Sequence, residues 1–341
     1  MRIAIATDAW SPQVNGVVTT LGQTRDHLVK EGHEVFMVTP ENRRTFPCPT
    51  YPEIRLTLFQ GRAIARELDE FEPDCVHIAT EGTIGLSVRR YCLKRGIPFT
   101  TAYHTQFPEY VRARFPIPAK WTVALLRWFH RPATRTMVPT EGMRKTLLER
   151  GFEDVVIWSR GVLTDVFRPD DPIEYEFDGP IWVYVGRVAV EKNIEAFLDL
   201  NLPGAKVIIG DGPDRKRLIN AYPNCHFLGY KFGRELARHI AGADVFVFPS
   251  KTDTFGIVML EAMACGVPVA AFPVTGPIDV VRAGETGCLH EDLITACSCA
   301  LELNRWDCRQ YAESRSWGRS TRQFVSHLAP RDTFLAEAKA A

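Results

Sequence analysis

The sequence has 341 residues, and its 41 Lys and Arg residues balance its 41 Asp and Glu residues at a formal net charge of zero. This length predicts two domains with ample cores, and the neutral charge gives no global sign of a nucleic-acid-binding protein. No run approaches the about 20 apolar residues of a membrane-spanning helix. The start "MRIAIATDAW" lacks the features of a secretory signal, so we expect a cytoplasmic protein.

The nine cysteines are scattered along the chain. The closest pair, Cys297 and Cys299, has the spacing C-x-C instead of the C-x-x-C of zinc and redox sites. We therefore expect reduced, mostly buried thiols and no metal site.

The first third alternates apolar strands with Gly-containing loops and amphipathic helices. The strand "RIAIATD" is followed by the loop "SPQVNGV", a helix through "TTLGQTRDHLVKEG" and the strand "HEVFMVT". The segments "PDCVHIAT" and "IPFTTAYH" are further strands. This order is typical of an α/β unit with a parallel sheet.

A second α/β unit begins near Ile181, after a Pro- and Asp-rich linker at 163–180. Its predicted strands are "PIWVYVG", "AKVIIGDG", "CHFLGY", "ADVFVFPS" and "VPVAAFPV". We predict a first domain over 1–165 and a second over 166–316. A helix at about 317–330 is expected to pack back on the first domain.

Ligands of open α/β sheets bind at the carboxyl ends of the strands. After the first strand, Gly16 in "NGV" would let the backbone approach an anion at a helix N-terminus, although Asn-Gly is also an ordinary turn. No loop carries the G-x-G-x-x-G of a nicotinamide-dependent dehydrogenase, and a P-loop is absent.

The strand "PIWVYVG" is followed by Arg187 and, five residues later, by Lys192 where a helix is expected to begin. Two cations there can hold a diphosphate and stabilise its charge as a leaving group. The alternative is a solvated pair of cations.

Asp253 and Glu261 stand eight positions apart around the start of a helix predicted from near Phe255 to Gly266. At about 100° a residue, they lie off the same helix face by roughly 80° and at different depths. That geometry favours two separate contacts over an acid/base dyad.

The segment "DTFGIVMLEAMACGVPV" resembles the retaining glycosyltransferases of family 4, whose signature is E-x7-E with Phe-Gly after the first acid. "NGV", "GRVAVEK", "GDGP", "FLGY" and "RGVLTDVFRP" are similar to further landmarks of that family, in the right order. The resemblance implies the GT-B fold, with two Rossmann-like domains facing across a cleft. A nucleotide-sugar would be held mainly by the C-terminal domain and an acceptor mainly by the N-terminal one.

The resemblance also implies roles for single residues. Arg187 and Lys192 would contact the donor diphosphate, which Gly16 would approach by backbone. Glu261 would hold the ribose hydroxyls and Asp253 the sugar hydroxyls. The amides of Phe255 and Gly256 would assist. His104 would lie near the transferred sugar. A satisfied core histidine is the alternative for His104.

Asp253 departs from the family, in which the first acid is usually Glu, so the sugar is left open. No residue offers an obvious double-displacement nucleophile. We therefore expect same-face attack, with Arg187 and Lys192 stabilising the leaving diphosphate and its phosphate oxygen helping to deprotonate the acceptor hydroxyl. No metal or other cofactor is expected, because the cations neutralise the charge.

A locally basic stretch runs from Tyr110 to Thr140 without any Asp or Glu. On a helical projection of "AKWTVALLRWFHR", four apolar residues are predicted to share one stripe: Trp121, Leu125, Trp128 and Phe129. The basic residues of the stretch are Arg112, Arg114, Lys120, Arg127, Arg131 and Arg135. We expect peripheral docking on an anionic membrane surface, with a core helix carrying solvated cations as the alternative.

Segments of the N-terminal half, such as "YHTQFPEYVRARF", look like bacterial members of the family that glycosylate lipids. They favour transfer of glucose or glucuronate from a UDP-sugar to diacylglycerol. Alternatives are a GDP-mannose-dependent mannosyltransferase acting on a lipid or soluble acceptor, and a non-catalytic nucleotide-sugar sensor. Base recognition is expected from backbone groups around Tyr230 and Lys231.

Overall fold

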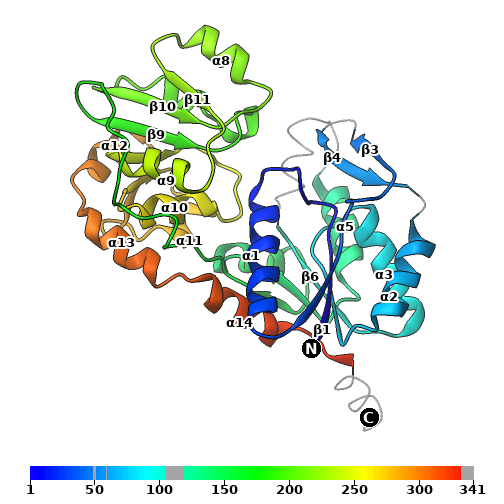
Figure 1. The fold of residues 1–341 in the computed structure, drawn as a ribbon. Coiled ribbons are helices and arrows are strands. Elements are labelled where there is room, and N and C mark those ends of the chain that lie inside the picture. Colours follow the sequence, from blue (N-terminus) through cyan, green and yellow to red (C-terminus); the bar gives the residue numbers. More distant parts are fainter. Residues whose placement is uncertain (49–50, 59, 105–118, 332–341) are drawn as a thin grey trace. The chain divides into compact units, whose positions relative to one another are not determined.

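The computed structural model describes residues 1–48, 51–58, 60–104 and 119–331. The chain divides into two compact units (Figure 1). The first comprises residues 1–159 and the chain from Gly318 on, and the second comprises residues 160–317. The sequence placed the boundary six residues later, at 165.

The first unit is built on a six-stranded sheet of order β2-β1-β5-β6-β7-β8, in which every pairing is parallel. Its strands are β1 Arg2–Ala6, β2 Glu34–Val38, β5 Cys75–Ile78, β6 Phe99–Ala102, β7 Arg135–Val138 and β8 Val155–Ile157. Its helices are α1 Gly16–Lys30, α2 Gly61–Phe71, α3 Thr83–Arg95, α5 Ala119–His130, α6 Glu141–Glu149 and α14 Trp317–His327. Helices cover both faces, so β1, β5 and β6 are apolar or Thr-rich and buried almost throughout.

The second unit repeats the plan with a parallel sheet of order β11-β10-β9-β12-β13-β14. Its strands are β9 Ile181–Val185, β10 Ala205–Ile209, β11 His226–Gly229, β12 Val245–Phe248, β13 Val269–Ala271 and β14 Gly287–Leu289. Its helices are α7 Glu195–Leu198, α8 Arg215–Ala221, α9 Gly233–Ala241, α10 Ile257–Ala264, α11 Pro277–Val280, α12 Leu293–Leu301 and α13 Arg305–Glu313. The two Rossmann-like sheets confirm the predicted α/β class.

The predicted strands are all present, whereas β7, β8, β14 and an antiparallel hairpin were not expected. The hairpin pairs β3 Thr45–Cys48 with β4 Tyr51–Thr57. The three missed parallel strands have only three or four residues each, too few to display a period.

Helix α14 packs on the first unit, as predicted. Phe324 and Leu328 lie in one buried cluster with Trp158. The Ser320 hydroxyl donates to the Ser159 carbonyl at 2.7 Å, and the Ser159 amide donates to Gln323 Oε1 at 2.8 Å. The end of the chain thereby closes the core of the domain in which it began.

The prediction of reduced cysteines is wrong for one pair, because Cys288 and Cys299 form a disulfide with a Cα–Cα distance of 6.0 Å. It links β14 to the exposed side of α12, a contact that their spacing did not suggest. Burial raises the pKa of the free thiols of Cys92, Cys265 and Cys297 to about 12, so these remain protonated. Among the described residues, no helix is long and apolar enough to cross a bilayer.

Candidate active site

The predicted site residues of the second unit follow two neighbouring strands at the centre of its sheet. Strands β9 and β12 pair in parallel, with Trp182 opposite Val245 and Val183 opposite Phe246. Their carboxyl ends therefore lie at the same edge of the sheet, where ligands of such sheets bind. Arg187 and Lys192 follow β9, and Asp253 follows β12.

The loop after β9 is narrow and backbone-bonded. Gly186 has a φ of 154°, and a Cβ there would stand 2.8 Å from the Tyr184 hydroxyl oxygen, so another residue would be strained. That hydroxyl donates to the Arg187 carbonyl at 2.9 Å. The helix expected to begin at Lys192 is instead a three-residue 3-10 turn, Val190–Lys192, and α7 starts only at Glu195.

Two hydrogen bonds join this turn to the loop after β12. Asn193 Nδ2 donates to the Pro249 carbonyl at 3.0 Å, and the Thr252 hydroxyl donates to the Glu191 carbonyl at 3.3 Å. The sequence analysis did not single out these four residues. Asn193 has a left-handed φ of 53°. Asn tolerates this conformation better than most residues do, and this preference is the local feature that could have indicated its role.

The same arrangement brings Lys192 and Asp253 into contact. Lys192 Nζ lies 2.7 Å from Asp253 Oδ1 and 2.9 Å from Asp253 Oδ2. Only 20% of the Lys192 side chain and 17% of the Asp253 side chain are exposed, so solvent screens the pair less than it screens a surface pair. The resemblance assigned Lys192 to the diphosphate and Asp253 to the sugar of one donor, and the structure shows the two side chains in contact with each other.

Glu261 is the fifth residue of α10, just over one turn inside the helix. Burial raises the pKa of its carboxyl group to about 7. Within the described ranges, this carboxylate makes no hydrogen bond or ion pair. A partly buried acceptor of this kind is suited to the hydroxyl groups of a ligand, which can donate hydrogen bonds to it.

The turn into α10 depends on two glycines. Gly256 occupies the N-cap position of α10 with a φ of 79°. Because glycine has no side chain, the first amides of α10 receive no acceptor from that position. Gly276, with a φ of 98°, packs so closely that a Cβ would lie 3.0 Å from the Asp253 carbonyl oxygen. Phe255, which directly precedes Gly256, is 8% exposed and anchors the loop in the core.

The "GDGP" loop after β10 is a structural support for the site. A Cβ on Gly210 would lie 1.9 Å from the Gly186 carbonyl oxygen, and one on Gly212 would lie 2.3 Å from the Val188 carbonyl oxygen. The Val188 amide donates to the Asp211 carbonyl at 2.9 Å. These glycines let the backbone press against the loop that carries Arg187.

Gly16 and His104 belong to the first unit. Gly16 is the first residue of α1, where Asn15 Oδ1 accepts hydrogen bonds of 3.0 Å from the amides of Val17 and Val18. Asn15 is thus an N-cap, and the anion contact of Gly16 stays a prediction. His104 follows β6, with its ring edge-on to Trp158 at 5.7 Å.

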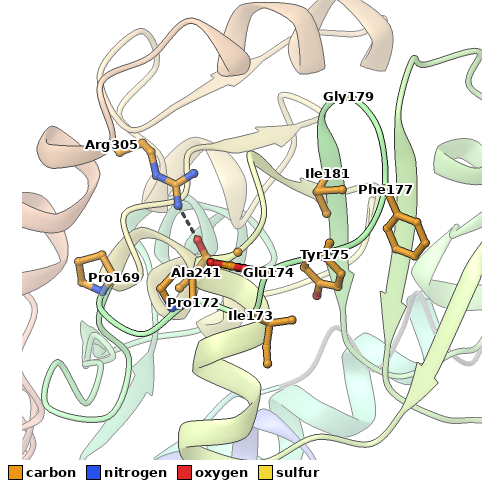
Figure 2. Close-up of a pocket in the computed structure, with 11 residues that line it drawn as sticks. Pro169, Pro172, Ile173, Glu174, Tyr175, Phe177, Gly179, Ile181, Ala241 and Arg305 are labelled. Carbon is orange, nitrogen blue, oxygen red and sulfur yellow. Dashed lines mark hydrogen bonds between the residues drawn. The ribbon is translucent and has the colours of Figure 1, made fainter.

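A hollow of about 560 Å³ in the second unit lies elsewhere (Figure 2). The linker lines it with Tyr175 and Phe177, and Ile181 lies at the amino end of β9. Figure 2 shows Arg305 reaching to Ala241, whose carbonyl accepts its hydrogen bond at 2.8 Å. This hollow is therefore at the end of the sheet opposite to Lys192 and Asp253. No cluster of three or more His, Cys, Asp or Glu side chains suited to a metal occurs in the described part of the chain.

Helix α5 carries only part of the predicted membrane stripe. Trp121, Leu125 and Trp128 are exposed to 66%, 58% and 52%, whereas Phe129 is buried at 3%. Placing Phe129 in the stripe was wrong, because consecutive residues differ by about 100° and Phe129 turns into the core beside β5 and β6. Arg112 and Arg114 lie outside the described residues.

Comparisons with known proteins identify the family of the chain. The profile described as Glycosyltransferase Family 4 matches residues 14–166, and that described as Glycosyl transferases group 1 matches residues 179–302. A GDP-mannose-dependent alpha-mannosyltransferase of Mycobacterium tuberculosis is 33% identical over 318 residues, covering 85% of this chain and 83% of the relative. An alpha-monoglucosyldiacylglycerol synthase of Acholeplasma laidlawii is 29% identical, covering 79% of both chains.

Solved structures extend the likeness to the whole fold. Sucrose-phosphate synthase of Thermosynechococcus elongatus superposes with a TM-score of 0.74 at 19% identity, covering 100% of both chains. The Anabaena protein HepE, solved with UDP and glucose, gives a TM-score of 0.67 at 15% identity, covering 95% of this chain and 98% of HepE. At these identities the likeness shows the GT-B fold alone.

Proposed function

Since the chain belongs to glycosyltransferase family 4, we propose that it transfers a hexosyl group from a nucleoside diphosphate sugar to a lipid hydroxyl at the cytoplasmic face of an anionic membrane. The observation that carries the proposal is the contact of Lys192 with Asp253 at the carboxyl ends of β9 and β12, with Glu261 in α10, the helix that follows β12. One cation and two carboxylates of different depth match the three parts of such a donor: diphosphate, sugar and ribose.

The proposed binding mode assigns one contact to each side chain. Arg187 and Lys192 hold the diphosphate, Asp253 accepts hydrogen bonds from sugar hydroxyls, and Glu261 accepts them from the ribose. An ammonium group has three N–H donors, so Lys192 can bridge Asp253 and a phosphate oxygen. The first amides of α10, near Phe255 and Gly256, assist on the sugar side.

The proposed reaction retains the anomeric configuration, as is usual for this family. The bond between the anomeric carbon and the diphosphate oxygen breaks, and the diphosphate leaves with the electron pair. The acceptor oxygen forms its bond on the same face while its proton passes to a phosphate oxygen. Arg187 and Lys192 stabilise the charge that grows on the leaving group. The contribution of His104 stays a prediction.

For the donor we put GDP-mannose first. Relatives named as GDP-mannose-dependent mannosyltransferases reach 33% and 32% identity, above the 29% and 28% of the two monoglucosyldiacylglycerol synthases. The names of those synthases favour the second candidate, transfer of glucose or glucuronate from a UDP-sugar to diacylglycerol. Asp253 has a side chain shorter by one methylene than the family Glu. This difference is compatible with either donor.

A donor panel tests the proposal. Purified protein is mixed with anionic liposomes containing diacylglycerol or phosphatidylinositol, together with GDP-mannose, UDP-glucose, UDP-glucuronate or UDP-galactose, one at a time. Mass spectrometry of the extracted lipid then gives acceptor and donor together. A glycosylated lipid with one donor supports the proposal. Nucleotide-sugar binding without any glycosylated product would instead favour a nucleotide-sugar sensor.

A further inference from the structure

The first unit exposes an unusual amount of apolar surface on two adjacent helices. Leu86 and Leu93 of α3 are 41% and 48% exposed, in addition to the three exposed residues of α5. Single exposed apolar residues are common in proteins, but five on two packed helices form a patch, and patches of this kind mark interaction sites. We call this patch, with its flanking cations, the α3–α5 face.

A hollow of about 490 Å³ connects the two helices within this face. Leu86 and Leu93 line it from α3, and Trp128 lines it from α5, with basic residues completing the wall: Arg89, Arg90 and Lys94. Trp121 and Leu125 continue the apolar surface along α5, because they precede Trp128 by seven and three positions and so project from the same side. The indole rings and the hollow thus form one continuous surface.

Arg89 fixes this arrangement. Its guanidinium group stacks 4.1 Å from the Trp128 ring centroid. It also donates at 2.9 Å to the carbonyls of Trp128 and Phe129. Arg89 therefore holds the Trp128 ring at the surface of the unit.

The charge of the face has one sign. Neither α3 nor α5 contains Asp or Glu, and both carry exposed cations: Arg90, Lys94, Lys120 and Arg127. Arg95 is neutralised at 2.7 Å by Asp69 of α2. No ion pair of Arg90 or Lys94 occurs among the described residues. Cations that border exposed indole and leucine side chains complement a surface with anionic headgroups above an apolar interior.

We propose that the α3–α5 face is a docking surface for an anionic phospholipid bilayer. Arg90 and Lys94 contact lipid phosphates, and the hollow between Leu86, Leu93 and Trp128 receives the upper part of an acyl chain. The indoles of Trp121 and Trp128 lie at the headgroup level, which suits a ring with one polar edge. This inference rests on the proposed membrane acceptor and adds the surface that would bring the enzyme to it.

The test is vesicle binding by the full chain, without donor or acceptor. Binding is measured by cosedimentation with vesicles of phosphatidylglycerol and phosphatidylcholine, and with phosphatidylcholine vesicles alone. The account predicts binding to the anionic vesicles that weakens with salt, and a blue shift of tryptophan emission. No binding, or equal binding to both kinds of vesicle, would overturn it. A face covered by another segment of the chain or reserved for a protein partner would give that result.

Two double variants locate the surface. R90Q/K94Q should weaken partition onto anionic vesicles by about 25-fold at low salt, because each lost cation weakens it by about fivefold. L86S/L93S should weaken it and remove part of the blue shift. The matched controls are Lys145→Gln and Leu148→Ser on α6, which are similarly exposed in the same unit and should bind as the wild type does. Variants that bind like these controls would refute the assignment.

Because this assay contains no nucleotide-sugar, its failure is separate from failure of the proposed function. Transfer by the wild-type protein to detergent-dispersed lipid reports on the active site alone. Transfer in detergent without vesicle binding would reject only the docking surface. Vesicle binding without transfer to any lipid would reject only the reaction.

Discussion

Lys192 Nζ contacts both carboxylate oxygens of Asp253, at 2.7 and 2.9 Å, although the two residues are 61 positions apart in the sequence. The pair joins the loop after β9 to the loop after β12 and fixes the cation proposed for the donor diphosphate. Asp253 therefore has two roles in the account. It orients Lys192 before the donor arrives, and it accepts sugar hydroxyls afterwards.

Asp253→Asn should separate these roles. The variant keeps the size of the side chain but removes the charge that competes with a diphosphate for Lys192. We expect nucleoside diphosphate to bind a few-fold more tightly, because about 1 kcal/mol of competition is removed. Transfer should fall at least tenfold, since the strong acceptor for the sugar is lost.

Calorimetric titration with GDP and UDP measures the first effect, and initial rates measure the second. Glu302→Gln, which changes the net charge equally at an exposed position at the end of α12, is the control. If Asp253→Asn binds nucleoside diphosphate more weakly and the control does not, the prediction is wrong. The Asp253 carboxylate would then aid diphosphate binding by positioning Lys192 more than it opposes binding by competing for Lys192.

Glu261→Gln should stabilise the fold at high pH while it weakens donor binding. Burial raises the pKa of Glu261 from 4.5 to about 7, so the folded state binds this proton more tightly than the unfolded state does. The resulting stabilisation is complete below pH 4.5 and is lost as pH rises through 7. Above pH 7 the wild type carries a desolvated charge that costs up to about 3 kcal/mol, and glutamine does not carry it.

Urea unfolding of both proteins at pH 8 and at pH 5 checks the prediction. The gain in the free energy of unfolding should be largest at pH 8 and should shrink toward pH 5. A gain that is the same at both values would show that the carboxyl group does not titrate in this range.

Gly276→Ala should damage the site through the backbone. Alanine at a φ of 98° is strained, and its Cβ would stand 3.0 Å from the Asp253 carbonyl oxygen. Gly284→Ala has a similar φ of 80° but no atom within 4 Å of the new Cβ, so it measures strain alone. We expect about 1 kcal/mol of destabilisation for Gly284→Ala and a larger loss, with slower transfer, for Gly276→Ala. Equal effects of the two variants on transfer would contradict the role of Gly276 in placing Asp253.

The sequence predicted most of the fold because the parallel strands are continuous apolar runs, such as those of β9 and β12. It also placed Asp253 before a helix and Glu261 within it, since Gly266 marks the end of that helix. The pairing of Lys192 with Asp253 depends on which strands are neighbours, a property of sheet order that no local pattern carries. The same limit applies to Cys288 and Cys299. Phe129 was misplaced because a stripe drawn on a projection does not show which side meets the core.

Turnover of Lys192→Met with the active donor tests the central claim most directly. Release of nucleoside diphosphate is followed in the presence of acceptor vesicles for the wild type, for Lys192→Met and for Lys216→Met, an exposed lysine of α8 in the same unit. The account predicts a fall of about 10²- to 10³-fold in kcat for Lys192→Met, the loss of one preorganised contact to the leaving group, and no change for Lys216→Met. A Lys192→Met variant that turns over at the wild-type rate would contradict the assignment of the donor site to the ends of β9 and β12.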